Sequence, residues 1–127
     1  MWIFTRYGFY SIACADKPGT KIIDPDTVMV RARVKKHLNN LQDRFTTLAD
    51  TKILTLQGHD YDFRMLIPKS TWLQILNQLA DEQVWRNFKL EAANNVKQTG
   101  IDYTRALHEV WGTMYSLQEA RSGREWF

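Results

Sequence analysis

Residues 30–36 (VRARVKK) and residues 63–69 (FRMLIPK) share one organisation, in which a strand pattern runs directly into a helical pattern. Aligning the two segments brings Arg31 opposite Arg64. Such an echo predicts two neighbouring strands at the centre of one sheet, each followed by a helix, and we expect these strands to be parallel. Both arginines then lie on the sheet face away from the helices.

The periodicity of the flanking segments extends this pattern. Alternating apolar residues predict a strand over 27–34, and apolar residues at helical spacing predict a helix over 35–45. Aromatic and β-branched residues predict a first strand over 2–7 that continues or bends after Gly8. Further predicted elements are a hairpin of strands 52–56 and 61–67, a helix opening at residues 68–70, a shorter helix over 84–95 and a last helix from about residue 102.

This element order predicts a single α+β domain over residues 1–127 with one continuous core. Strand, strand, helix, strand, strand, helix is the order of a ferredoxin-like fold whose last strand has moved to the front, a circular permutation. We therefore expect a four-stranded, antiparallel-rich sheet with two packing helices and additional C-terminal helices. Proline, glycine and aspartate residues predict a loop over 15–27. Apolar residues show no regular spacing over 120–127, which predicts a flexible tail.

Composition narrows the class of protein. With 44% hydrophobic and 13% aromatic residues, the chain has enough apolar material for a packed core and does not resemble a disordered one. A single cysteine, Cys14, excludes an intramolecular disulfide and a CxxC zinc site, which favours a reducing compartment. The N-terminal apolar run lacks a preceding basic stretch, and no run is long enough to span a membrane. We therefore expect a cytoplasmic protein with no membrane partner.

The arginine-bearing sheet face is the strongest functional signal. Residues 28–45 carry a net charge of +4, counting five basic residues against one aspartate, although the whole chain carries only +3. Arg31, Arg33 and Arg64 are expected to cluster on this face, near Asp62 and Leu66. Aromatic residues of the first strand, Tyr7, Tyr10 or Phe9, are expected beside them. Arginines with adjacent rings are typical of sheets that pair phosphates and stack bases.

A structural explanation competes with this one, and we favour it for the arginines themselves. The last helix has a wide apolar stripe that needs a partner, and the aromatic-rich first strand carries rings on both faces. If the helix covers the arginine-bearing face, the three arginines pair internally with Asp62, Glu109 or Asp102, because buried charges are normally paired.

The histidines suggest a weaker, catalytic alternative. His37, His59 and His108 are scattered and lack the spacing of metal ligands. His59 or His37, with arginines as charge stabilisers, would fit a small phosphoester hydrolase. No phosphate-binding glycine loop, dinucleotide fingerprint or nucleophile motif is present in the sequence, so we expect neither a metal nor a cofactor.

The chain resembles a family of small, uncharacterised bacterial proteins that open MW-[IL]-F-T-x-x-G-F-[FY]-S. The matching segments are MWIFT at 1–5, GFYS at 8–11, VRARV at 30–34, DY at 60–61, NFK at 87–89, LHEVW at 107–111 and MY at 114–115. They extend over nearly the whole chain. The resemblance implies no activity, cofactor or site residue.

The leading functional prediction is a non-enzymatic binding or interaction module for an anionic ligand, either RNA or a nucleotide. The residues predicted to bind the ligand are Arg31, Arg33, Arg64, Tyr7 and Lys89, of which Lys89 opens a helix. The alternatives are the phosphoester hydrolase and a homodimer that associates through the aromatic strand or the last helix.

Overall fold

The computed structural model describes residues 1–121, with side chains through residue 118, and shows an α+β fold built on one five-stranded sheet. Every neighbouring pair of strands is antiparallel, in the order β1-β2-β3-β5-β4. The strands are β1 (Trp2–Thr5), β2 (Gly8–Asp16), β3 (Ile23–Ala32), β4 (Leu54–Thr55) and β5 (Phe63–Pro68). The predicted α+β class is confirmed, but the sheet has five strands where four were predicted.

The central strands β3 and β5 are neighbours as predicted, but the prediction that they are parallel is wrong. Arg31 lies directly opposite Arg64 in an antiparallel register. The connections explain the direction. The helical connection after β3 carries the chain back, so that β4 runs in the same direction as β3. A hairpin then reverses the chain, and β5 lies between β3 and β4, antiparallel to both.

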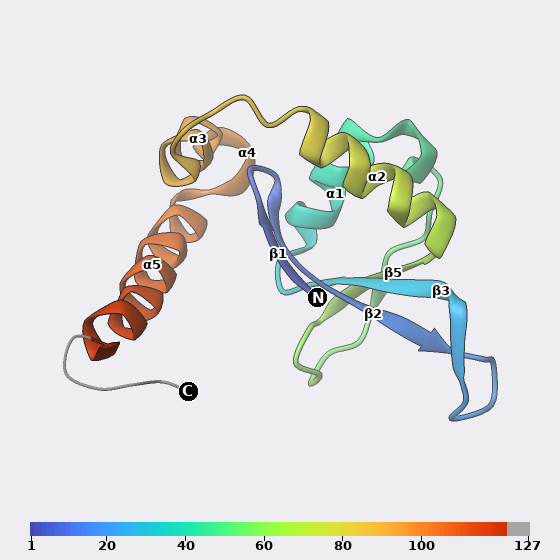
Figure 1. Cartoon of the computed structure of the whole chain (residues 1–127). Coiled ribbons are helices and arrows are strands. Elements are labelled where there is room, and N and C mark those ends of the chain that lie inside the picture. The colour runs from blue at the N-terminus through green and yellow to red at the C-terminus, as the bar shows by residue number, and fades with distance from the viewer. Residues whose placement is uncertain (122–127) are drawn as a thin grey trace.

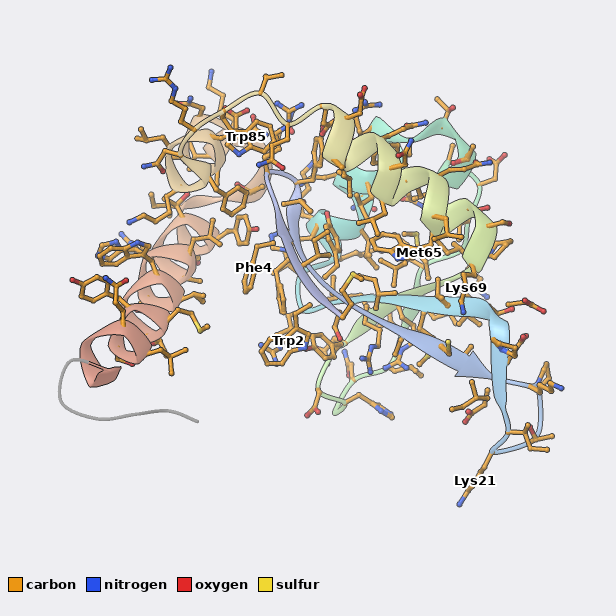
Figure 2. All side chains as sticks on the ribbon, in the orientation of Figure 1. Trp2, Phe4, Lys21, Met65, Lys69 and Trp85 are labelled. Carbon is orange, nitrogen blue, oxygen red and sulfur yellow. The ribbon has the colours of Figure 1, made fainter. Side chains whose placement is uncertain are left out.

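Two helices cover one face of the sheet and form the main core with it (Figure 1). These helices are α1 (Lys35–Arg44) and α2 (Lys69–Asp81), and a short 3-10 turn, η1 (Thr46–Leu48), follows α1. Alternate residues of β3 and β5 point into this core, among them Val30 and Met65, which are both fully buried. Figure 2 shows Met65 between the sheet and the helices. The other sheet face, hereafter the outer face, carries the intervening residues.

The loop predicted over residues 15–27 is much shorter in the structure. Strands β2 and β3 continue into it and leave only residues 17–22 as the connection, closed by a bond from the Lys17 amide to the Ile22 carbonyl. Pro25 is tolerated within β3 because β5 pairs with that strand only from Thr27 onward, so the proline is not required to donate to a central ladder. The register also shifts between Cys14 and Asp16.

The C-terminal helices form a second, smaller apolar cluster, whereas one continuous core was predicted. They are α3 (Phe88–Asn94), α4 (Val96–Thr99) and α5 (Ile101–Arg121). Tyr103 and Leu107 of α5 pack with Ala92 of α3 against Phe4 and Phe9 of the first hairpin. Helix α5 includes the start of the tail predicted to be flexible, and residues 122–127 lie outside the described part of the chain.

Within residues 1–121, no helix is both long enough and apolar enough to cross a membrane.

Candidate functional site

Strand pairing places a row of five side chains across the outer face. Trp2 lies opposite Ser11, Ser11 opposite Arg31, and Arg31 opposite Arg64, which faces Leu54 at the edge. Directly opposed residues of antiparallel strands point to the same side of a sheet. Trp2, at 71% exposure, and the two arginines therefore share one surface.

Three arginines gather at Tyr61, which lies two residues before the start of β5. The guanidinium carbons of Arg31 and Arg33 lie 4.9 and 4.7 Å from the ring centroid. Arg64 donates from Nη2 to the Tyr61 carbonyl at 3.3 Å. Phe9 contacts the same ring, with centroids 6.4 Å apart. We call Arg31, Arg33 and Arg64, gathered around Tyr61, the arginine cluster.

The remaining hydrogen bonds of the cluster are made to neutral groups. Arg31 donates to the hydroxyl of Ser11 at 2.8 Å, and Nε of Arg33 donates to the carbonyl of Asp60 at 3.3 Å. Arg64 contacts the sulfur of Met29 at 3.6 Å. Within residues 1–118, no carboxylate lies within ion-pair distance of any of the three guanidinium groups.

The favoured expectation that the last helix covers this face is therefore wrong for the described part of the chain. The arginine cluster makes no ion pair with any of the three expected carboxylates, Asp62, Glu109 and Asp102. Helix α5 docks only its first turns, through Tyr103 and Leu107, onto the end of the first hairpin and then leads away from the sheet (Figure 1). The hydroxyl of Tyr103 donates to the Thr5 carbonyl at 2.7 Å and fixes this docking point.

Two of the like charges of the cluster, those of Arg31 and Arg64, lie close enough to disfavour each other. Burial, together with the neighbouring Arg31 guanidinium, lowers the pKa of Arg64 from its ordinary value. Like charges directly opposite each other on a sheet are destabilising, so this arrangement is kept at some cost to the fold.

Tyr7 and Tyr10 do not join the arginine cluster, whereas Phe9 does. Tyr7 lies in the two-residue turn between β1 and β2, where its hydroxyl donates to Glu82 at 2.7 Å. Tyr10 is fully buried on the helix side of the sheet, and its hydroxyl donates to the His37 carbonyl at 2.6 Å. Alternation along β2 sends residues 9 and 10 to opposite faces.

Lys89 lies on α3 and contacts α5 rather than the arginine cluster. Its Nζ is 4.5 Å from the centroid of the Trp111 ring and 3.5 Å from Nδ1 of His108. Trp111 stacks on His108 and on Tyr115, with centroids 6.2 and 5.2 Å apart. The structure therefore separates Lys89 from the other predicted site residues and places it in an exposed aromatic ladder.

The two histidines considered for catalysis have contrasting surroundings. His59 is exposed in the β4–β5 turn. His37 of α1 is only 4% exposed, and its Nδ1 accepts from the Phe9 amide at 3.3 Å, so Nε2 carries the proton of the neutral ring. Among the described residues, no group meets hydrogen-bond geometry with Nε2 of His37, although the nearby Thr99 backbone is close enough to raise the pKa of the ring. Burial is the larger effect, and the pKa of His37 is lowered.

This lowered pKa predicts an acid-sensitive fold. In the unfolded chain His37 has its ordinary pKa, near 6.5, so the unfolded state takes up a proton before the folded state does. The stabilisation that the neutral His37 ring contributes is fully present above the unfolded-state pKa. It is lost as the pH falls toward the lower pKa of the folded state. Between about pH 7.5 and 5.5, denaturant unfolding of the wild type should lose more free energy than that of His37→Gln. Equal losses would show that His37 does not contribute.

Two residues of the face, Trp2 and Tyr61, were not among the predicted site residues. The two-residue turn between Thr5 and Gly8 fixes the register of β1 on β2. Recognising that turn from the sequence would have placed Trp2 on the arginine face by alternation. Tyr61 carries no such signal, because its ring reaches the cluster from a loop.

Comparison of the chain with protein-family models, curated protein sequences and solved structures finds no match.

Proposed function

We propose that the protein is a non-enzymatic binding module and that the outer face of its sheet binds single-stranded RNA or a nucleotide. The observation that carries this proposal is the arginine cluster: two guanidinium groups over the Tyr61 ring and a third bonded to the Tyr61 carbonyl, with no carboxylate partner in the described residues. A bound anion would relieve the repulsion between Arg31 and Arg64. Guanidinium groups match phosphate oxygens in charge and in geometry, which makes phosphate the anion of choice.

The exposed ring of Trp2 favours a nucleic acid over a simple anion. Trp2 lies in the same cross-strand row as Arg31, two strands away, which is about 10 Å at the usual strand spacing. Stacking on aromatic rings and pairing of phosphates with basic groups are the two contacts that single-stranded nucleic acids make with sheets. Both are available on the outer face.

A double substitution tests the proposal. Arg31→Ala with Arg64→Ala should weaken binding of a short, labelled poly(U) RNA at least about tenfold in fluorescence anisotropy. Losing two phosphate contacts should also reduce the slope of log affinity against log salt by about 1.4. The matched control, Lys17→Ala with Lys21→Ala, removes the same charge from the exposed β2–β3 connection and should bind nearly as well as wild type.

Two results would contradict the proposal. One is a wild-type protein that shows no salt-dependent affinity for RNA or nucleotides. The other is an equal loss of affinity in the arginine and lysine variants, because general charge rather than the arginine cluster would then explain binding.

Self-association is a second candidate, favoured by the exposed apolar side chains on the distal half of α5. Trp111, Met114 and Leu117 are each about half exposed. A contiguous apolar surface of this kind marks an interaction site in many proteins. The binding titration is therefore run beside a measurement of molecular mass over the same concentrations, and the mass rises with concentration only if this candidate holds.

For the fold, we propose that β2, β3, β4 and β5 with α1 and α2 form the permuted ferredoxin-like unit predicted from the element order, with β1 added at the edge. The strand order and the helical connections after β3 and β5 support this reading.

A further inference from the structure

A groove of about 640 Å³ runs along the junction between the outer face and the first half of α5. One wall is formed by rings of the first hairpin, where Phe4 and Phe9 are stacked 4.6 Å apart and Trp2 meets Phe9 edge-on at 6.0 Å. Figure 2 shows Phe4 and Trp2 on the strand that faces α5. This volume lies within the usual range for a small-molecule site.

The opposite wall is formed by α5, and it meets the first wall where Tyr103 and Leu107 pack against Phe4 and Phe9. Ala106, Leu107 and Val110 of α5 line it, and the groove follows this helix from Ile101 to Val110. Those nine steps correspond to about 14 Å at the helical rise per residue. A slot between flat rings and a row of aliphatic side chains suits a narrow, extended apolar tail.

The polar groups of the groove favour a negative charge. Arg33 lines it, with its guanidinium over the Tyr61 ring and its Nε donating to the Asp60 carbonyl, and its two terminal nitrogens make no hydrogen bond within the described residues. The charge of Asp102, the carboxylate at the same rim, is screened, because its side chain is 96% exposed to water and lies 3.7 Å from Arg105. His37 also lines the groove.

We infer that this groove binds an amphipathic carboxylate, of the class of medium-chain fatty acids. The apolar tail lies between the hairpin rings and α5, and the carboxylate is held by the terminal nitrogens of Arg33. Guanidinium and carboxylate groups pair through two parallel hydrogen bonds, which is the reason for choosing this head group. The groove shares Arg33 and Trp2 with the face proposed to bind RNA, but Arg31 and Arg64, which the RNA-binding variant removes, do not line it, so different substitutions test the two proposals.

Titration calorimetry with octanoate, and with 1-octanol as the uncharged probe of the same length, tests the inference. The wild type should bind octanoate at one saturable site. Ala106→Trp places a large ring in the groove from an exposed helix position and should weaken binding at least tenfold. Thr113→Trp, two turns further along the exposed part of α5, is the matched control and should bind as wild type does.

Arg33→Ala separates the head group from the tail. It should weaken octanoate binding by about tenfold, as expected for a lost charged hydrogen bond, and leave octanol binding unchanged. The inference is overturned if wild type shows no saturable octanoate binding, if Ala106→Trp binds as tightly as Thr113→Trp, or if Arg33→Ala weakens both probes equally. Arg31→Ala with Arg64→Ala leaves the groove lining intact and should bind octanoate as wild type does, so failure here is distinguishable from failure of the RNA proposal.

Discussion

Replacing Gly8 with alanine should lower the free energy of unfolding by about 3–5 kcal/mol, through backbone strain and overpacking together. Gly8 begins β2 with φ = +148°, a conformation that residues with a Cβ rarely adopt. It also closes the first hairpin, where the Thr5 hydroxyl donates to its carbonyl at 3.0 Å. The backbone at this position cannot relax without loosening the turn.

The second contribution is a direct collision with His37. A Cβ on Gly8 would lie 2.3 Å from Cγ of the His37 ring, well inside contact distance. The ring cannot withdraw easily, because its Nδ1 accepts from the Phe9 amide and its backbone carbonyl accepts from Tyr10. Strain and collision therefore act at the same place.

Urea denaturation of Gly8→Ala and Gly19→Ala measures this difference. Gly19 also has a positive φ, +72°, but a Cβ there would meet nothing within 4 Å. Its replacement should cost only about 1–2 kcal/mol from the backbone alone. Similar losses in the two variants would show that the contact with His37 can be relieved and that the packing argument is wrong.

Removing the carboxylate of Glu82 should cost about 2–3 kcal/mol, because it leaves several donors without their acceptor in a mostly buried position. Glu82 follows the last residue of α2, and its side chain is 13% exposed. It accepts from the Tyr7 hydroxyl at 2.7 Å and from Nη2 of Arg44 at 2.8 Å. Arg6 lies 3.4 Å away and also pairs with Glu91 of α3. One carboxylate thus joins the first hairpin to the ends of α1 and α2.

Thermal or urea unfolding of Glu82→Ala, beside Asp102→Ala, provides the measurement. Asp102 is also an ion-paired carboxylate, but its side chain is 96% exposed and its partner Arg105 is 72% exposed. An exposed pair of this kind contributes about 0.5 kcal/mol or less. Equal effects of the two substitutions would mean that the Glu82 network contributes no more than a surface ion pair does.

The sequence predicted those features that depend on short-range periodicity. Alternation and helical spacing located β3, α1 and β5, and the echo between residues 30–36 and 63–69 correctly made Arg31 and Arg64 neighbours. The relative direction of these strands was wrong, because direction follows from the hairpin and the helical connection rather than from local pattern. Arg31 and Arg64, by contrast, lie on the same face of the sheet whether the two strands are parallel or antiparallel.

Features that depend on non-local contacts were not predicted. A helix stripe shows that α5 needs an apolar partner, but it does not show that Phe4 and Phe9 provide it at the end of the hairpin. Gly8 left two readings open, a first strand that continues past it or one that bends there, and with the turn unrecognised Tyr7 was placed beside the arginines. In the structure the tight turn directs Tyr7 toward Glu82.

The docking of α5 by its first turns alone divides the helix into two thermodynamic regions. Tyr103 and Leu107 tie the first region to the body, so its amide protons exchange with solvent only when the hairpin contact opens. Among the described side chains beyond Val110, Trp111 contacts Lys89 of α3, and over these turns the helix depends mainly on intrinsic helix propensity. The distal turns are therefore the part of the helix that melts first, and a partner bound there would act by suppressing local unfolding.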